Sequence, residues 1–142
     1  MSQAVANTIR RLADANLTKT KALPAAAASN ATASIDLGST VLGPVADDIS
    51  VEVSIPATPA LVDAKTIILT LKDSADDSTF TAIASLGVIT QTGASSAGAA
   101  AFTQRYKLPS NCRRYLRLDA AVLTAGGDNT AVSYTLKVLA SS

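Results

Sequence analysis

The sequence predicts an all-β fold, an antiparallel sandwich of two sheets, and three observations support this. Apolar and polar residues alternate in short segments from residue 24 onward, which is the period of a half-buried strand. Hydrophobic residues make up 48% of the chain but aromatic residues only 4%, so the apolar content is mainly small and β-branched side chains that suit sheets. No helical pattern after residue 24 is long enough for a βαβ crossover, which favours antiparallel pairing.

Eight segments predict strands. The clearest is 49–55, where Ile49, Val51, Val53 and Ile55 alternate with polar residues. The eight segments are residues 32–37, 49–55, 65–72, 79–84, 86–92, 101–108, 111–123 and 131–139. Eight strands in two sheets are typical of a jelly roll. An immunoglobulin-like sandwich is the alternative, although one Cys and no Trp leave its Cys…Trp…Cys signature absent.

The chain divides into an N-terminal arm, residues 1–24, and a β-sandwich domain, residues 25–142. Ile9, Leu12 and Leu17 recur at helical spacing, so part of the arm could form a short amphipathic helix, and otherwise it is extended. About eleven residues are marginal for an isolated helix, so the arm needs a partner surface on its own domain or on another chain. The first 21 residues are basic, since Asp14 stands against Arg10, Arg11, Lys19 and Lys21.

Three arginines, Arg113, Arg114 and Arg117, lie within five positions of each other in the segment 111–123. Arg113, Tyr115 and Arg117 share the polar parity of the predicted strand, so we expect them on an outward face that contacts a neighbouring subunit. Arg114 falls on the apolar parity with Cys112. A bulge near Arg113, or a buried ion pair with Asp36 or Asp119, would account for it. Cys112 is expected to be a buried free thiol.

The residue inventory argues against catalysis and against bound cofactors. The chain has no His and one Cys, which removes the commonest general base and every zinc ligand set built on His and Cys. No phosphate-cradling glycine motif is present. Asp73, Asp76 and Asp77 predict a solvated acidic turn rather than a metal site. We therefore expect no enzyme, no cofactor, no metal and no small-molecule substrate.

Charge and hydropathy bear on partners and location. A net charge of +1 gives no electrostatic case for nucleic acid, and no run of 18 apolar residues predicts a membrane span. Residues 1–12 lack the continuous apolar segment of a signal peptide. We expect the protein to be made in the cytoplasm of a cell.

Several short segments, taken in order, resemble the jelly-roll capsid cement (decoration) proteins of tailed bacteriophages, particularly the Bordetella-phage type. The resemblance runs over roughly residues 12–140. The matching segments are residues 12–15 (Leu-Ala-Asp-Ala), 34–38 (Ser-Ile-Asp-Leu-Gly), 49–55, 66–71, 73–80 (Asp-Ser-Ala-Asp-Asp-Ser-Thr-Phe), 114–118 (Arg-Tyr-Leu-Arg-Leu) and 132–138.

The resemblance implies a structural protein on the outer surface of a phage capsid. Such proteins are usually homotrimers that bridge neighbouring major-capsid-protein subunits and stabilise the head. The residues expected to contact the capsid or another subunit are Ile9, Arg10, Arg11, Leu12, Leu17, Lys19, Lys21, Arg113, Tyr115 and Arg117. The alternative function, resting on jelly-roll architecture alone, is a carbohydrate-binding or adhesin-type module.

Overall fold

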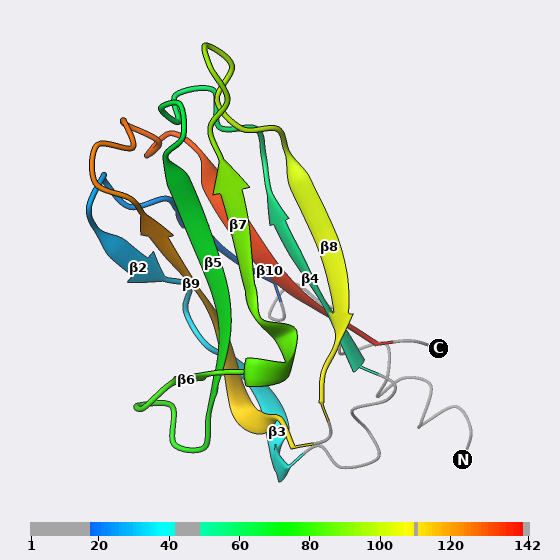
Figure 1. Cartoon of the computed structure of the whole chain (residues 1–142). Helices are drawn as coiled ribbons and strands as arrows, with labels where there is room; N and C mark the ends of the chain where they lie inside the picture. The colour runs from blue at the N-terminus through cyan, green and yellow to red at the C-terminus, as the bar shows by residue number, and fades with distance from the viewer. Residues whose placement is uncertain (1–17, 42–48, 110, 141–142) are drawn as a thin grey trace.

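The computed structural model describes residues 18–41, 49–109 and 111–140, which form a β-sandwich (Figure 1). Over these ranges there are ten strands, one 3-10 helix (η3, Ala84–Leu86) and no α-helix. The strands are β1 (Thr18–Ala22), β2 (Ser29–Ala31), β3 (Ile35–Val41), β4 (Ile49–Ile55), β5 (Thr66–Ser74), β6 (Thr81–Ala82), β7 (Val88–Thr92), β8 (Phe102–Lys107), β9 (Arg113–Val122) and β10 (Ser133–Ala140). The all-β prediction is confirmed.

The strand order is that of a jelly roll. A four-stranded sheet has the order β1-β10-β4-β8, and a six-stranded sheet contains β2, β9, β5 and β6, with β3 also paired to β9 and β7 to β5. All these pairs are antiparallel. β2 and β3 pair with the same edge of β9 and can be taken as one interrupted strand, and the two-residue β6 extends the edge formed by β7. The ten strands then reduce to the eight strands of a jelly roll. Every connection except that from β5 to β7 then crosses between the sheets.

The strand boundaries differ from the prediction mainly near the N-terminus. The predicted strand 49–55 coincides with β4. β1, by contrast, falls within the predicted arm, and it pairs with β10 from Thr18↔Lys137 to Ala22↔Ser133. Residues 18–22 are therefore part of the sandwich, at the edge of the four-stranded sheet. The predicted strand 79–84 shortens to β6, and the chain then turns through η3.

The core lies between the sheets and follows the alternation in the sequence. Each long strand buries every second side chain in one continuous apolar cluster. From the six-stranded sheet and then the four-stranded sheet, its members include Leu116, Leu118, Val122, Ile67, Leu69, Leu71, Val51, Val53, Ile55, Tyr134, Leu136 and Val138, all at most 3% exposed.

A side-chain relay ties the N-terminal edge to this core. The buried Tyr134 of β10 donates its hydroxyl hydrogen bond to Asn30 Oδ1 of β2 at 2.7 Å. The Asn30 amide in turn donates to the Ala22 carbonyl at the end of β1, at 2.8 Å. The relay joins the two sheets through one buried phenol, so β1 and β2 are positioned together.

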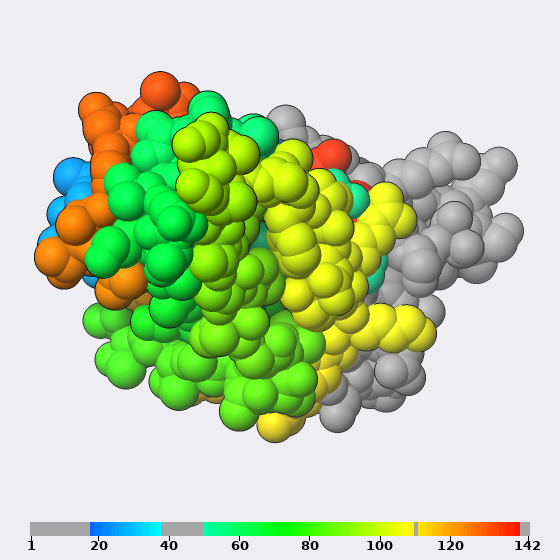
Figure 2. Space-filling model, turned by 45° about the horizontal axis from the view of Figure 1, so that its top comes forward, coloured from blue at the N-terminus to red at the C-terminus, as the bar shows by residue number. Residues whose placement is uncertain are grey.

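The loops at one end of the sandwich pack against one another (Figure 2), and close backbone approach locks them in place. Gly98 has φ of +66°, and a Cβ there would lie 2.0 Å from the Thr58 carbonyl oxygen. Gly127 has φ of +89°, and its Cβ would lie 2.5 Å from the Ala60 carbonyl oxygen. Any other residue would be strained and would also clash. These glycines hold the β7–β8 and β9–β10 loops against the β4–β5 loop, and we call this region the loop end.

Truncating a central core side chain should strongly destabilise the fold. Leu118→Ala, at a position with 0% exposure, should lower the free energy of unfolding by about 2–5 kcal/mol, because it leaves a cavity between the sheets. Leu123→Ala, where the side chain is 46% exposed, should change it by no more than about 0.5 kcal/mol. Urea unfolding followed by circular dichroism measures both, and equal losses would contradict the assigned packing.

Candidate functional site

Each arginine of β9 is held by an acid of the same chain, and Arg113 and Arg117 lie on the outward parity of the six-stranded sheet. Arg117 donates from Nε to Asp119 Oδ1 at 2.8 Å, and Lys72 Nζ lies 2.9 Å from Asp119 Oδ2. The Arg117 guanidinium also stacks over the Phe80 ring, 4.2 Å from its centroid. One carboxylate thus neutralises two cations, and the loop before β6 is pinned to β9 by a cation–π contact.

Arg113 is fixed by the best-buried acid on this sheet. Its backbone N–H donates to Asp73 Oδ2 at 3.0 Å, and its Nη2 donates to Asp73 Oδ1 at 2.7 Å and to the Asp73 carbonyl at 3.0 Å. Asp73 is only 8% exposed. This multiple contact is charge-assisted, so it joins the start of β9 firmly to the end of β5.

Arg114 makes the ion pair with Asp36 that the sequence suggested. Its Nε and Nη2 donate to the two Asp36 oxygens at 2.7 and 2.9 Å. The pair is half exposed rather than buried, at 39% for Arg114 and 46% for Asp36. The register of β3 against β9 shifts between Asp36 and Val41, and this irregularity lets a residue on the apolar parity reach an outward acid.

Only part of the predicted contact set falls on described residues. Arg113 and Arg117 are engaged within the chain, and Tyr115 lies half-buried beside Arg114. Lys19 and Lys21 lie on β1 and pair in register with the buried Leu136 and Tyr134. They make no ion pair within the described ranges, and such lysines hinder edge-to-edge pairing. Ile9, Arg10, Arg11, Leu12 and Leu17 lie outside the described residues. A contact role for the whole set remains a prediction.

The acidic loop after β5 is organised by its own hydrogen bonds. Asp76 Oδ1 accepts from the Ser74 hydroxyl at 2.8 Å and from the Ser78 and Thr79 backbone N–H groups at 3.0 Å. These hydrogen bonds lower the pKa of Asp76 to about 2, and the one from the Thr79 N–H has the largest effect. Asp73 meanwhile faces Arg113. Across the described ranges, no three His, Cys, Asp or Glu side chains are grouped so that they could hold a metal ion.

Cys112 is fully buried and free of any disulfide, as expected. Burial in the core, and secondarily the nearby Asp73 carboxylate, raise the pKa of its thiol to about 12. The thiol is therefore neutral at physiological pH and acts as a small apolar side chain.

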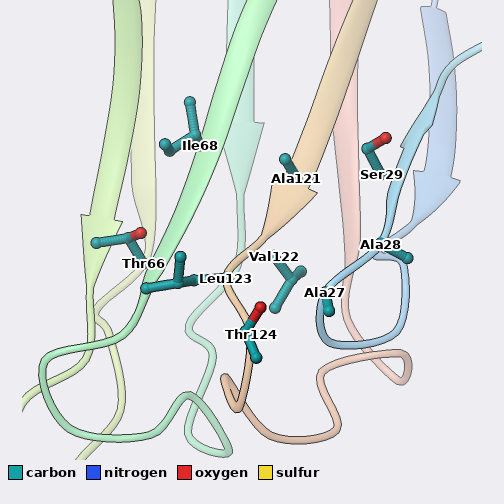
Figure 3. A pocket seen from close by; sticks show the side chains of 9 residues that line it. All are labelled: Ala27, Ala28, Ser29, Thr66, Ile68, Ala121, Val122, Leu123 and Thr124. Atoms are coloured by element: carbon teal, nitrogen blue, oxygen red, sulfur yellow. The ribbon is translucent and has the colours of Figure 1, made fainter.

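The sequence prediction did not include an uncharged groove on the same sheet face (Figure 3). The groove has a volume of about 330 Å³ and runs over the end of β9, between the turn before β2 and the start of β5. Its lining includes Ala28, Thr66, Ile68, Ala121 and Leu123. A signal was visible in the sequence: Ile68 lies on the same parity as Thr70 and Lys72, where an outward side chain is expected.

These features define the class of the molecule, a jelly-roll β-sandwich whose surface carries paired charges and an open, uncharged groove. The chain belongs to the Bbp16 family, whose model matches residues 17–138.

One solved structure shows a similar fold at low sequence identity. A crystal structure of the PBSX exported protein XepA matches with a TM-score of 0.55 and 16% identity, over 87% of this chain and 36% of that one. The chain therefore spans about a third of the length of that protein, and the likeness shows the fold alone.

Weaker similarities extend to two other structures. A pilus structure from Bacillus endospore appendages gives a TM-score of 0.40 at 13% identity, over 88% of this chain and 86% of that one. Chitosan-binding module 1 from a chitosanase/glucanase of Paenibacillus sp. IK-5 gives a TM-score of 0.35 at 14% identity, over 89% of this chain and 96% of that one. Neither score carries a functional argument. No curated protein matches the chain, and the described part contains no helix long and apolar enough to cross a membrane.

Removing the buried acid should cost far more than breaking the exposed pair. Asp73→Ala removes the carboxylate acceptors of Arg113 and should lower the free energy of unfolding by roughly 2–3 kcal/mol. The matched control, Arg114→Ala, breaks a half-exposed pair and should have a much smaller effect. Urea unfolding of both variants at low ionic strength provides the comparison. A larger loss for Arg114→Ala would mean that β9 is anchored elsewhere.

Proposed function

We propose that the chain is a structural virion protein that binds the outer surface of a phage capsid and cements neighbouring major-capsid-protein subunits. Membership of the Bbp16 family over residues 17–138 carries the proposal, and the ordered segments that resemble phage cement proteins support it. In this role the protein's partners are the major capsid protein and further copies of itself. Its place is the outside of the head.

The geometry suits a protein that works by holding its neighbours. Locked loops, a continuous core and the ion pairs of β9 make a stiff plate, so little ordering would be needed on docking. Assembly as a homotrimer would multiply weak contacts, because the second and third sites bind at high effective concentration. Stiffness and multiplicity are what a cement needs to resist outward strain on a shell.

Residues 1–17 are proposed as a second point of attachment. They precede Thr18, which pairs with Lys137 at the sheet edge, so the sandwich holds the base of this segment. Seventeen residues span at most about 60 Å when extended, which is enough to reach a neighbouring subunit. Their composition combines Ile9, Leu12 and Leu17 with Arg10 and Arg11, and it can therefore offer both apolar and charge-assisted contacts.

Co-sedimentation with phage heads tests the function. The full chain should pellet with purified heads and saturate at a fixed copy number per head. A variant lacking residues 1–17, which keeps β1, should stay folded by circular dichroism but show weaker retention. Full-length protein that remains in the supernatant at every head concentration would refute the cement role. Full retention of the shortened chain would refute only the role of the segment.

A glycan array separates the alternative from the leading function. A capsid cement protein should give no selective signal on the array. Selective binding to one glycan class, together with failure to pellet with heads, would favour the carbohydrate-binding module instead.

A further inference from the structure

Charge is divided along the outward face of the six-stranded sheet. Among the described residues, outward positions far from the loop end hold the ion pairs of Arg113, Arg117 and Lys72. Outward positions nearer the loop end carry no charge. This neutral face consists of Ser29 of β2, Thr66, Ile68 and Thr70 of β5, Val88, Thr90 and Thr92 of β7, Ala121 of β9, and Leu123. The Lys72–Asp119 pair marks its border.

The exposed large apolar side chains of the described residues gather on or beside this face. Ile68, Val88 and Leu123 belong to it and are 37%, 59% and 46% exposed, respectively. Val62 is 43% exposed and borders the neutral face through two backbone hydrogen bonds. The Val62 N–H donates to the Gly126 carbonyl, and the Gly126 N–H donates to the carbonyl of Leu123, which belongs to the face. Where burial is described for the four-stranded sheet, no outward large apolar side chain is exposed to this degree, and Leu139 of β10 is half-buried. Clustering of this sort marks an interaction site rather than scattered surface exposure.

The neutral face is hollowed where its side chains are small. The 330 Å³ groove is lined by the turn at Ala27 and Ala28 on one side and by Thr66 and Ile68 on the other, with Ala121 between them (Figure 3). A second hollow of about 190 Å³ shares Ser29, Ile68 and Ala121 with the first and ends at Lys72 and Asp119. The two hollows form one trough over β9, closed at one end by an ion pair.

The trough is preformed. Its floor is β9, paired to β5 from Ile67↔Val122 to Ser74↔Tyr115. Its open end is bounded by Leu123 and Thr124, which precede a loop held by the close approach of Gly126 to Val122 and Leu123. A partner would meet a fixed shape and would not have to order it.

We infer that the neutral face is the surface that docks on the shell, with the trough receiving an uncharged ridge of apolar side chains from the major capsid protein. The inference rests on the proposed function and names the contact face. Charge matching favours such a ridge, because a charged side chain would lose its hydration in the trough without meeting a free counter-charge. The arginines of β9 are already engaged with acids of the chain and leave this role to the neutral face.

Glutamate substitutions on the two outer faces test the inference. Ile68→Glu, and separately Val88→Glu at the more exposed position, should weaken retention on purified heads about tenfold or more, because a carboxylate would be buried at the contact. The control is Thr103→Glu, an exposed outward position of β8 on the opposite sheet, which should change retention less than about twofold. Circular dichroism and unfolding of each variant verify that the sandwich is intact.

The outcomes separate this inference from the function on which it rests. If the full-length chain fails to bind heads, the cement function itself is refuted. If it binds, and both glutamate variants bind as well as Thr103→Glu, the neutral face is not the contact. If the effect of Ile68→Glu vanishes in a chain lacking residues 1–17, the trough holds that segment instead. If the glutamate variants lose self-association by analytical ultracentrifugation yet bind heads normally, the occupant is a second copy. Both results would overturn the inference.

Discussion

The pairing of β9 on both of its sides is the constraint on which the rest of the structure depends. One edge of β9 pairs with β5 from Ile67↔Val122 to Ser74↔Tyr115, and the other pairs with β2 and then β3. Its inward residues Leu116 and Leu118 lie at the centre of the core. Its outward residues Arg113 and Arg117 meet acids of β5 and of β9 itself. A one-residue slip of this strand would exchange the two sets, so the core and the ion pairs enforce the same register.

The same strand also divides the surface into two kinds. Toward its start the outward side chains Arg113 and Arg117 are long and charged, and they tie the sheet together through Asp73 and Asp119. Toward its end the outward side chain is Ala121, so the trough opens between β2 and β5. Charges that are satisfied internally stiffen the sandwich, whereas an apolar hollow is left free for contact. This division explains why a conspicuous arginine cluster can be structural, while the small residues near the end of β9 leave a hollow on the same face.

Much of the fold could be predicted because long strands bury one face, and β4 coincides with its predicted range. β1 and β2 were not predicted: Thr18–Ala22 and Ser29–Ala31 contain no alternating large apolar residues, and their conformation is set by pairing with β10 and β9. The Arg113–Asp73 contact joins residues forty positions apart, and local periodicity carries no information about it. The neutral face was partly visible as Ile68 on an outward parity, but its extent depends on which strands the jelly roll places side by side.

A cryo-electron-microscopy map of heads carrying the protein would test the central claim most directly, because it shows both attachment and orientation. If the protein cements the shell through the neutral face, the map will show jelly rolls on the outside of the shell, at fixed positions, with Ile68, Val88 and Leu123 turned toward the major capsid protein. This interpretation is the one under test. It would be contradicted by heads without this density, or by density in which the outward face of the four-stranded sheet lies against the shell and the trough opens to solvent.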